Sequence, residues 1–123
     1  MGEKNCIFCK IANGDIPKQY HHEDKLIVAF DDAHPLAPVH VLIIPRKHIL
    51  SIDDLKEGDV ELAGRMVLVA QKIARKLNIA NDGYKLLFRV KKHGGQEVDH
   101  IHLHLVGGAP LSEDIRPLTT IKS

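Results

Sequence analysis

The sequence predicts an α+β domain in which an antiparallel sheet of about five strands is covered by one long and one short helix. Short runs of branched and aromatic residues recur along the chain, separated by proline, glycine and aspartate, as is typical of strands. One long segment instead repeats its apolar residues at helical spacing. Because most predicted strands follow one another directly, antiparallel pairing is favoured over a doubly wound parallel sheet.

The N-terminal half should supply the short helix and two of the strands. A helix is predicted at 7–12, where a short apolar stretch ends at a turn that contains glycine. After Pro17 the chain should run extended. Strands are predicted at 26–30 and 41–44, which should pair with each other across a loop containing two prolines.

The C-terminal half should supply the long helix and two further strands. The helix is predicted at 59–77, a strand at 84–90, a loop at 91–95 and a final strand at 100–106. The apolar residues that define the helix recur every three or four positions: Leu62, Met66, Val69, Ala70, Ile73 and Leu77. At 123 residues the chain suffices for one core, so we predict a single domain over 1–123.

Composition argues against two classes of partner. Lys and Arg total 17 against 16 Asp and Glu, and there is no Trp, so a basic, aromatic surface for nucleic acid is not expected. No apolar run approaches the roughly 20 residues that a membrane-spanning helix needs. The N-terminus has no basic and apolar signal for secretion. We therefore expect a cytoplasmic protein with reduced cysteines.

Three histidines alternate with aliphatic residues in the last predicted strand. Side chains in a strand point to alternate faces, so His100, His102 and His104 should share one face, with imidazoles roughly 6 to 7 Å apart. The aliphatic residues between them should pack against the helix. Three imidazoles on one face indicate a reactive site, and the pattern alone fits either metal ligands or a nucleophile.

The sequence around these histidines resembles the signature of the histidine-triad family. That signature, His-φ-His-φ-His-φ-φ with φ apolar, matches 100–106, and further similarity reaches upstream to 7–11 and 44–48. The two glycines at 107–108 resemble the nucleoside phosphoramidase branch. This resemblance covers nearly the whole chain. It implies a hydrolase that cleaves nucleoside 5′-monophosphate derivatives, such as purine nucleoside phosphoramidates, at the P–N bond.

The resemblance also implies a role for individual residues. His102 would be the nucleophile that forms a nucleotidyl-histidine intermediate, and the backbone of His100 would orient it. The catalytic set would be His102, His104, His100 and His40. Asp32 would hold the ribose hydroxyls. The residues that would bind the purine nucleotide are Phe8, Ile11, Ile16, Phe30, Asp32, Arg89, Gly95, Gln96, Glu97 and Val98.

A zinc site is a further expectation. Cys6 and Cys9 form a Cys-x2-Cys pair, which would need two more ligands for tetrahedral zinc. The resemblance to bacterial members implies that His48 and His100 complete the site. A shell of two thiolates and two imidazoles would serve a structural role, so no cofactor would be required for the chemistry. A redox dithiol and two small buried side chains remain the alternative interpretations.

Two other functions stay open at this point. The protein could bind nucleotides as a scaffold without turnover, or the three triad histidines could hold a catalytic metal. Three residues depart from the family pattern. Arg89 stands where many family members have asparagine, Glu97 where animal members have serine, and Asp99 where an aromatic residue is frequent. The resemblance also implies a homodimer formed through the long helix and the strand at 84–90.

Overall fold

The computed structural model describes residues 3–119 of the chain. Within the predicted domain of 1–123, the first two and the last four residues therefore lie outside the described part. The elements, in chain order, are α1 Ile7–Ala12, β1 Tyr20–Glu23, β2 Ile27–Asp31, β3 Val39–Pro45, the 3-10 turns η1 Ile52–Asp54 and η2 Glu57–Asp59, α2 Val60–Lys76, β4 Tyr84–Phe88, α3 Lys91–Gly94 and β5 Leu103–Gly107.

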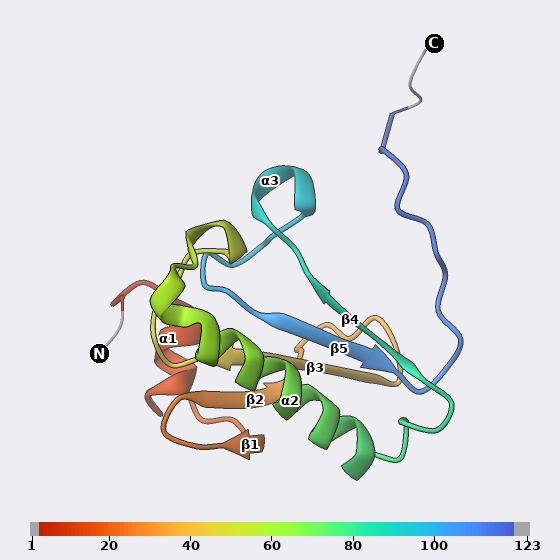
Figure 1. The fold of residues 1–123 in the computed structure, drawn as a ribbon, viewed down its shortest axis with the longest axis horizontal. Helices are drawn as coiled ribbons and strands as arrows, with labels where there is room; N and C mark the ends of the chain where they lie inside the picture. Colours follow the sequence, from red (N-terminus) through yellow and green to blue (C-terminus); the bar gives the residue numbers. More distant parts are fainter. Residues whose placement is uncertain (1–2, 120–123) are drawn as a thin grey trace.

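The strands form a five-stranded sheet in the order β1-β2-β3-β5-β4, and each neighbouring pair is antiparallel (Figure 1). This arrangement confirms the predicted α+β class. β5 lies between β3 and β4, so the strand that carries His104 is internal to the sheet. β1 and β4 are its edges. No helix within 3–119 is long and apolar enough to span a bilayer.

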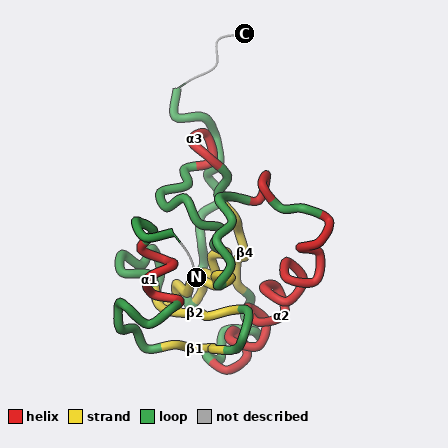
Figure 2. Tube along the Cα trace, turned by 90° about the vertical axis from the view of Figure 1, so that its left-hand side faces the viewer, coloured by secondary structure: helices red, strands yellow, loops and turns green. Residues whose placement is uncertain are grey.

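The sheet has a hydrophobic cluster on each face. α2 packs on one face against alternate residues of β2, β3 and β5, including Ile43, Leu103 and Leu105. α1 packs on the other face, where Phe8 contacts Phe30 edge to face. Figure 2 shows the two helices on opposite sides of the sheet. The prediction that the aliphatic residues of the last strand face the long helix is therefore confirmed.

Several predicted bounds agree with the structure. α1 occupies the predicted range, and α2 lies within 59–77, with Asp59 and Leu77 as its caps. The predicted pairing of the second and third strands is confirmed, although β3 extends two residues before the predicted run and includes Pro45. Pro45 is tolerated because it is the last residue of the strand.

Three predictions of local structure were wrong. β5 begins at Leu103, so His100 and His102 precede the strand, because the backbone N–H of Ile101 donates to Ile49 O instead of joining the ladder. β4 ends at Phe88, before Val90. The predicted loop at 91–95 contains the short helix α3, which is followed by Gly95 in the left-handed conformation that favours glycine.

Candidate active site

Four histidines gather on the α1 side of the sheet or immediately beside it. His104 pairs with Leu42 across β3 and β5, and His40 lies two residues before Leu42, so both point to the same face. His102 comes just before β5, with its ring 4.9 Å from that of His104. All four imidazoles are buried. The three triad imidazoles share the side of the sheet that faces α1: Phe8 packs against both His100 and His102, and His100 reaches the two cysteines at α1.

The hydrogen bond of His102 determines its tautomer. Its Nδ1 lies 2.7 Å from the carbonyl oxygen of His100, and because that oxygen only accepts, Nδ1 carries the proton. The neutral ring therefore has its lone pair on Nε2. Phe8 packs edge to face against this ring, 5.0 Å between centroids, and restricts its orientation. His102 is thus held as an oriented, neutral imidazole with a nucleophilic Nε2.

A second chain of hydrogen bonds determines the tautomers of His40 and His104. The backbone N–H of Leu36 donates to Nδ1 of His40 over 3.1 Å, so His40 carries its proton on Nε2. That Nε2–H lies 2.9 Å from Nδ1 of His104 and donates to it. His104 must then carry its proton on Nε2, a buried atom with no partner among the described residues. A ligand oxygen would satisfy this donor.

These tautomers also bear on a possible second metal site. Ligand atoms of Asp32, His40 and His104 lie close enough together to surround an ion. However, Nε2 of His40 carries a proton and donates it to His104 in the hydrogen bonds described above. It cannot coordinate a metal while it donates. The geometry favours a relay of hydrogen bonds at this position over a metal centre.

Burial keeps the active-site imidazoles neutral. Burial and, to a smaller extent, the neighbouring His102, His40 and Arg89 lower the pKa of His104 to about 4. Burial likewise lowers the pKa of His102 and of His40, although the carboxylate of Asp32 opposes the shift in both. A neutral imidazole is the form that acts as a nucleophile. Because these pKa values are lowered, the imidazoles stay neutral at pH values at which an ordinary histidine is protonated.

Stability should depend on pH through His104. In the unfolded chain His104 takes up a proton near pH 6.5, whereas in the folded protein it does so only near pH 4. The free energy of unfolding should therefore fall as pH decreases between these values. Urea unfolding at pH 7 and pH 5 measures the loss. We expect a smaller loss for His104→Gln than for the wild type when both are saturated with zinc. Equal losses would contradict the assignment.

Beside the triad, four side chains converge from distant parts of the chain. His100 Nδ1 lies 3.4 Å from Sγ of both Cys6 and Cys9, and 3.2 Å from Nδ1 of His48. Nδ1 of His48 is also 3.2 Å from Sγ of Cys9. The cluster joins α1 to the segments after β3 and before β5. The structure thus brings together the four residues predicted to bind zinc.

The donor atoms in this cluster fit a tetrahedral ion. Nε2 of His100 donates to the carbonyl oxygen of Pro45 over 2.8 Å, which leaves the lone pair on Nδ1, facing the thiols. Zinc bonds to sulfur and nitrogen imply spacings of about 3.3 to 3.6 Å between ligand atoms, close to those observed. When bound, zinc would supply a crosslink through a closed shell of four protein ligands.

The predicted nucleotide-binding residues fall into two groups. Phe8, Ile11 and Phe30 are buried in the cluster beneath α1, with Ile16 and Val98 packed against it. The carboxylate of Asp32 is bound at one oxygen, which accepts from His34 N over 2.8 Å. Its other oxygen lies 3.4 Å from Nε2 of His40, at the edge of the triad.

Of the remaining predicted residues, Gly95, Gln96 and Glu97 lie in the turn that follows α3, whereas Arg89 lies between β4 and α3. The side chain of Gln96 donates to the carbonyl oxygens of Leu50 and Val98 and accepts from the N–H of Lys91. It therefore organises the loop. Glu97 is exposed. Sequence reasoning missed two backbone partners, the Leu36 N–H and the Pro45 carbonyl, because every residue offers a backbone carbonyl and every residue except proline a backbone N–H.

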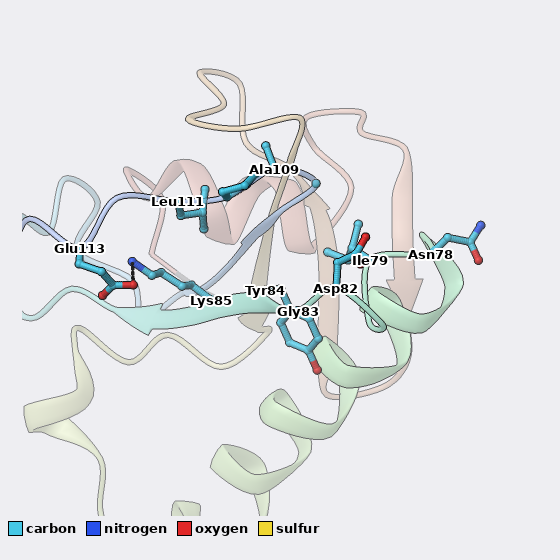
Figure 3. A pocket seen from close by; sticks show the side chains of 11 residues that line it. Asn78, Ile79, Asp82, Gly83, Tyr84, Lys85, Ala109, Leu111 and Glu113 are labelled. Atoms are coloured by element: carbon cyan, nitrogen blue, oxygen red, sulfur yellow. Dashed lines mark ion pairs between the residues drawn. The ribbon is translucent and has the colours of Figure 1, made fainter.

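A separate hollow lies between the start of β4 and the segment that follows β5 (Figure 3). Tyr84, Leu111 and the ion pair between Lys85 and Glu113 line it, with an Nζ to Oε1 distance of 3.0 Å. None of its lining residues is a histidine or cysteine. The chemistry of the imidazoles is therefore located elsewhere on the molecule.

Comparison with known proteins gives consistent results. The family model described as "Scavenger mRNA decapping enzyme C-term binding" matches residues 5–113. The purine nucleoside phosphoramidase of Escherichia coli (strain K12) is 48% identical over 105 residues, covering 85% of this chain and 88% of that protein. Protein HitA of Neisseria gonorrhoeae is 44% identical over 103 residues, 84% of this chain and 95% of that protein.

Two solved structures share the fold. The crystal structure of a HIT family hydrolase from Legionella pneumophila Philadelphia 1 superposes with a TM-score of 0.87 at 50% identity, covering 89% of this chain and 97% of that one. A histidine triad protein from Clostridium difficile gives 0.89 at 37% identity, covering 93% and 99%. The family match over residues 5–113 includes the elements from α1 to β5 that position the imidazoles.

Proposed function

Since the chain belongs to the histidine-triad family of hydrolases, we propose that it hydrolyses purine nucleoside phosphoramidates and related nucleotidyl conjugates at the P–N bond. The observation that carries this proposal is the hydrogen bond from His102 to the His100 carbonyl, which aims an unprotonated Nε2 away from the backbone. The activity of the E. coli relative, as its name gives it, supports the choice of substrate class.

The reaction would proceed in two displacements. Nε2 of His102 attacks the α-phosphorus, the P–N bond breaks, and the leaving nitrogen takes a proton from solvent to depart as an amine. Water then attacks the phosphorus of the nucleotidyl-histidine, releasing the nucleoside monophosphate, a proton and neutral His102. Nε2–H of His104 has no partner among the described residues and would donate to a phosphoryl oxygen. Division into two steps lowers each barrier.

The nucleoside would lie toward β2. In this proposal the purine contacts the apolar side chains near α1, and Asp32 accepts hydrogen bonds from the ribose hydroxyls. Gln96 would act by holding the turn at Gly95, Glu97 and Val98 beside the phosphate, because its own amide is already bound to backbone carbonyls. His40 would position His104 through the observed hydrogen bond.

Zinc is proposed as a structural ion at Cys6, Cys9, His48 and His100. The spacing and the tautomer of His100 support this assignment. Such a thiolate site suits the reducing cytoplasm, which is the proposed location. The alternative in which all three triad histidines hold one catalytic metal is not favoured, because each group of potential ligands within 3–119 contains only one of them.

A homodimer through α2 and β4 is also proposed. β4 is an edge strand, and Leu86 on it is exposed, as are Val67 and Leu68 on α2. An uncovered apolar edge favours association. Sedimentation equilibrium should give a dimer. Leu86→Lys should weaken it by about tenfold or more, as expected for loss of one buried leucine, whereas Leu26→Lys should not. A monomeric wild type would contradict the proposal.

The intermediate provides the direct test of the proposed function. Zinc-saturated enzyme mixed with adenosine 5′-phosphoramidate is quenched rapidly into alkali, and the peptides are analysed by mass spectrometry. We expect an adenylyl group on the peptide that contains His102, formed and lost at rates that account for turnover. Tight binding of the nucleotide without turnover or adduct would instead identify a binding protein and overturn the proposal.

A further inference from the structure

Arg89 directly follows β4, the strand that pairs with β5 beside the proposed nucleophile. β4 and β5 pair with Leu87 opposite His104 and Phe88 opposite Leu103. The next residues in this register are Arg89 and His102, and the backbone remains extended at Val90. Because side chains alternate, Arg89 shares the face of the two histidines, and opposed side chains in a sheet lie within contact of one another.

The guanidinium group of Arg89 has no acidic partner in the described part of the chain. A Cβ at Gly95 would meet Nη1 of Arg89 at 3.6 Å, so the group lies against the turn after α3. Among residues 3–119, no carboxylate lies within 4.0 Å of its nitrogens. Beyond the effect of burial, its charge lowers the pKa of His102 and His104. It is a half-buried cation whose charge acts on the site.

The order of the strands places Arg89 and the proposed nucleoside site on opposite sides of β5. Phe30 and Asp32, proposed to hold the nucleoside, lie in or directly after β2, and His102 lies immediately before β5. Arg89 follows β4, on the far side of β5 from β2. A substrate whose phosphorus is at His102 and whose nucleoside is near β2 therefore has its remaining group, the leaving amine, available to Arg89.

On this basis, and resting on the proposed function, we infer that Arg89 selects conjugates whose leaving amine carries a carboxylate close to the scissile nitrogen, as in an N-linked amino acid. A guanidinium binds a carboxylate through two parallel hydrogen bonds, which an uncharged amide cannot reproduce. The bond-breaking steps are those already given, and Arg89 takes no part in proton transfer. It is a specificity-determining residue for the leaving group.

A matched pair of substrates tests this inference. The glycine and glycinamide conjugates of adenosine 5′-phosphoramidate differ in the carboxylate, and kcat/KM is measured for both with the wild type, Arg89→Gln and Lys92→Gln. The glycine-to-glycinamide ratio should fall about tenfold or more in Arg89→Gln, as expected for one charge-assisted pair. Lys92 is an exposed cation on α3, and its replacement should leave the ratio unchanged.

A binding measurement separates this inference from the proposed function. The same two conjugates are titrated calorimetrically into His102→Ala, with and without Arg89→Gln. A preference for the glycine conjugate that depends on Arg89 supports the inference even if the wild type turns over neither substrate. Equal effects of Arg89→Gln on the two conjugates, in turnover or in binding, would overturn it and would assign Arg89 to the phosphate shared by both.

Discussion

Replacement of His102 by alanine is expected to reduce hydrolysis of adenosine 5′-phosphoramidate by at least about 10³-fold, as for other enzymes that lose a nucleophile. The reason is that His102 donates its Nδ1–H to the His100 carbonyl and has a buried donor, Nε2 of His104, as a neighbour. No other imidazole in 3–119 combines these two features. Steady-state release of adenosine monophosphate, followed by chromatography, measures the effect. Nucleotide binding should persist in the variant.

A matched histidine provides the control for this experiment. His93 lies on α3, is exposed and belongs to neither cluster, so His93→Ala should retain the wild-type rate. Circular dichroism and thermal unfolding establish that both variants are folded. If His102→Ala kept a rate within a few-fold of the wild type, the two-step mechanism would be wrong, and a directly activated water would have to be considered.

Removal of the metal from the Cys6, Cys9, His48 and His100 site is expected to lower both stability and turnover. The site links α1 to the segment before β5, so its loss should cost several kcal/mol, equivalent to at least about 10 °C in Tm for a domain of this size. Turnover should fall because the carbonyl of His100 orients His102. His48→Ala tests this, since His48 is outside the triad.

The measurements are zinc content by mass spectrometry, Tm with and without added zinc, and kcat. Met66→Ala serves as the matched control, because Met66 is buried in the α2 cluster on the opposite face of the sheet. It should lower Tm by a similar amount but leave the response to zinc intact. A wild-type protein that binds no zinc, with a Tm indifferent to chelator, would eliminate the structural zinc site.

The pattern of apolar residues predicted those helices and strands whose buried residues follow one another within a single element. The spacing from Leu62 to Leu77 identified α2 because its buried stripe repeats along one helix, and short runs of branched and aromatic residues identified β2 and β3 as strands. The same reasoning failed before β5. The pattern His-φ-His-φ-His looks like continuous strand, yet the chain leaves the ladder at Ile101, whose N–H donates to Ile49, more than 50 residues earlier.

The sequence by itself determined which chemical groups are available: three closely spaced imidazoles, a Cys-x2-Cys pair and a single long amphipathic helix. Only the tertiary structure decided what each imidazole does. His100 faces the cysteines, His102 presents Nε2, and His104 keeps a donor that has no partner within 3–119, because their other nitrogens bond to Pro45, His100 and His40. Tautomers depend on partners supplied by other segments, and backbone carbonyls and amides carry no signature in the sequence.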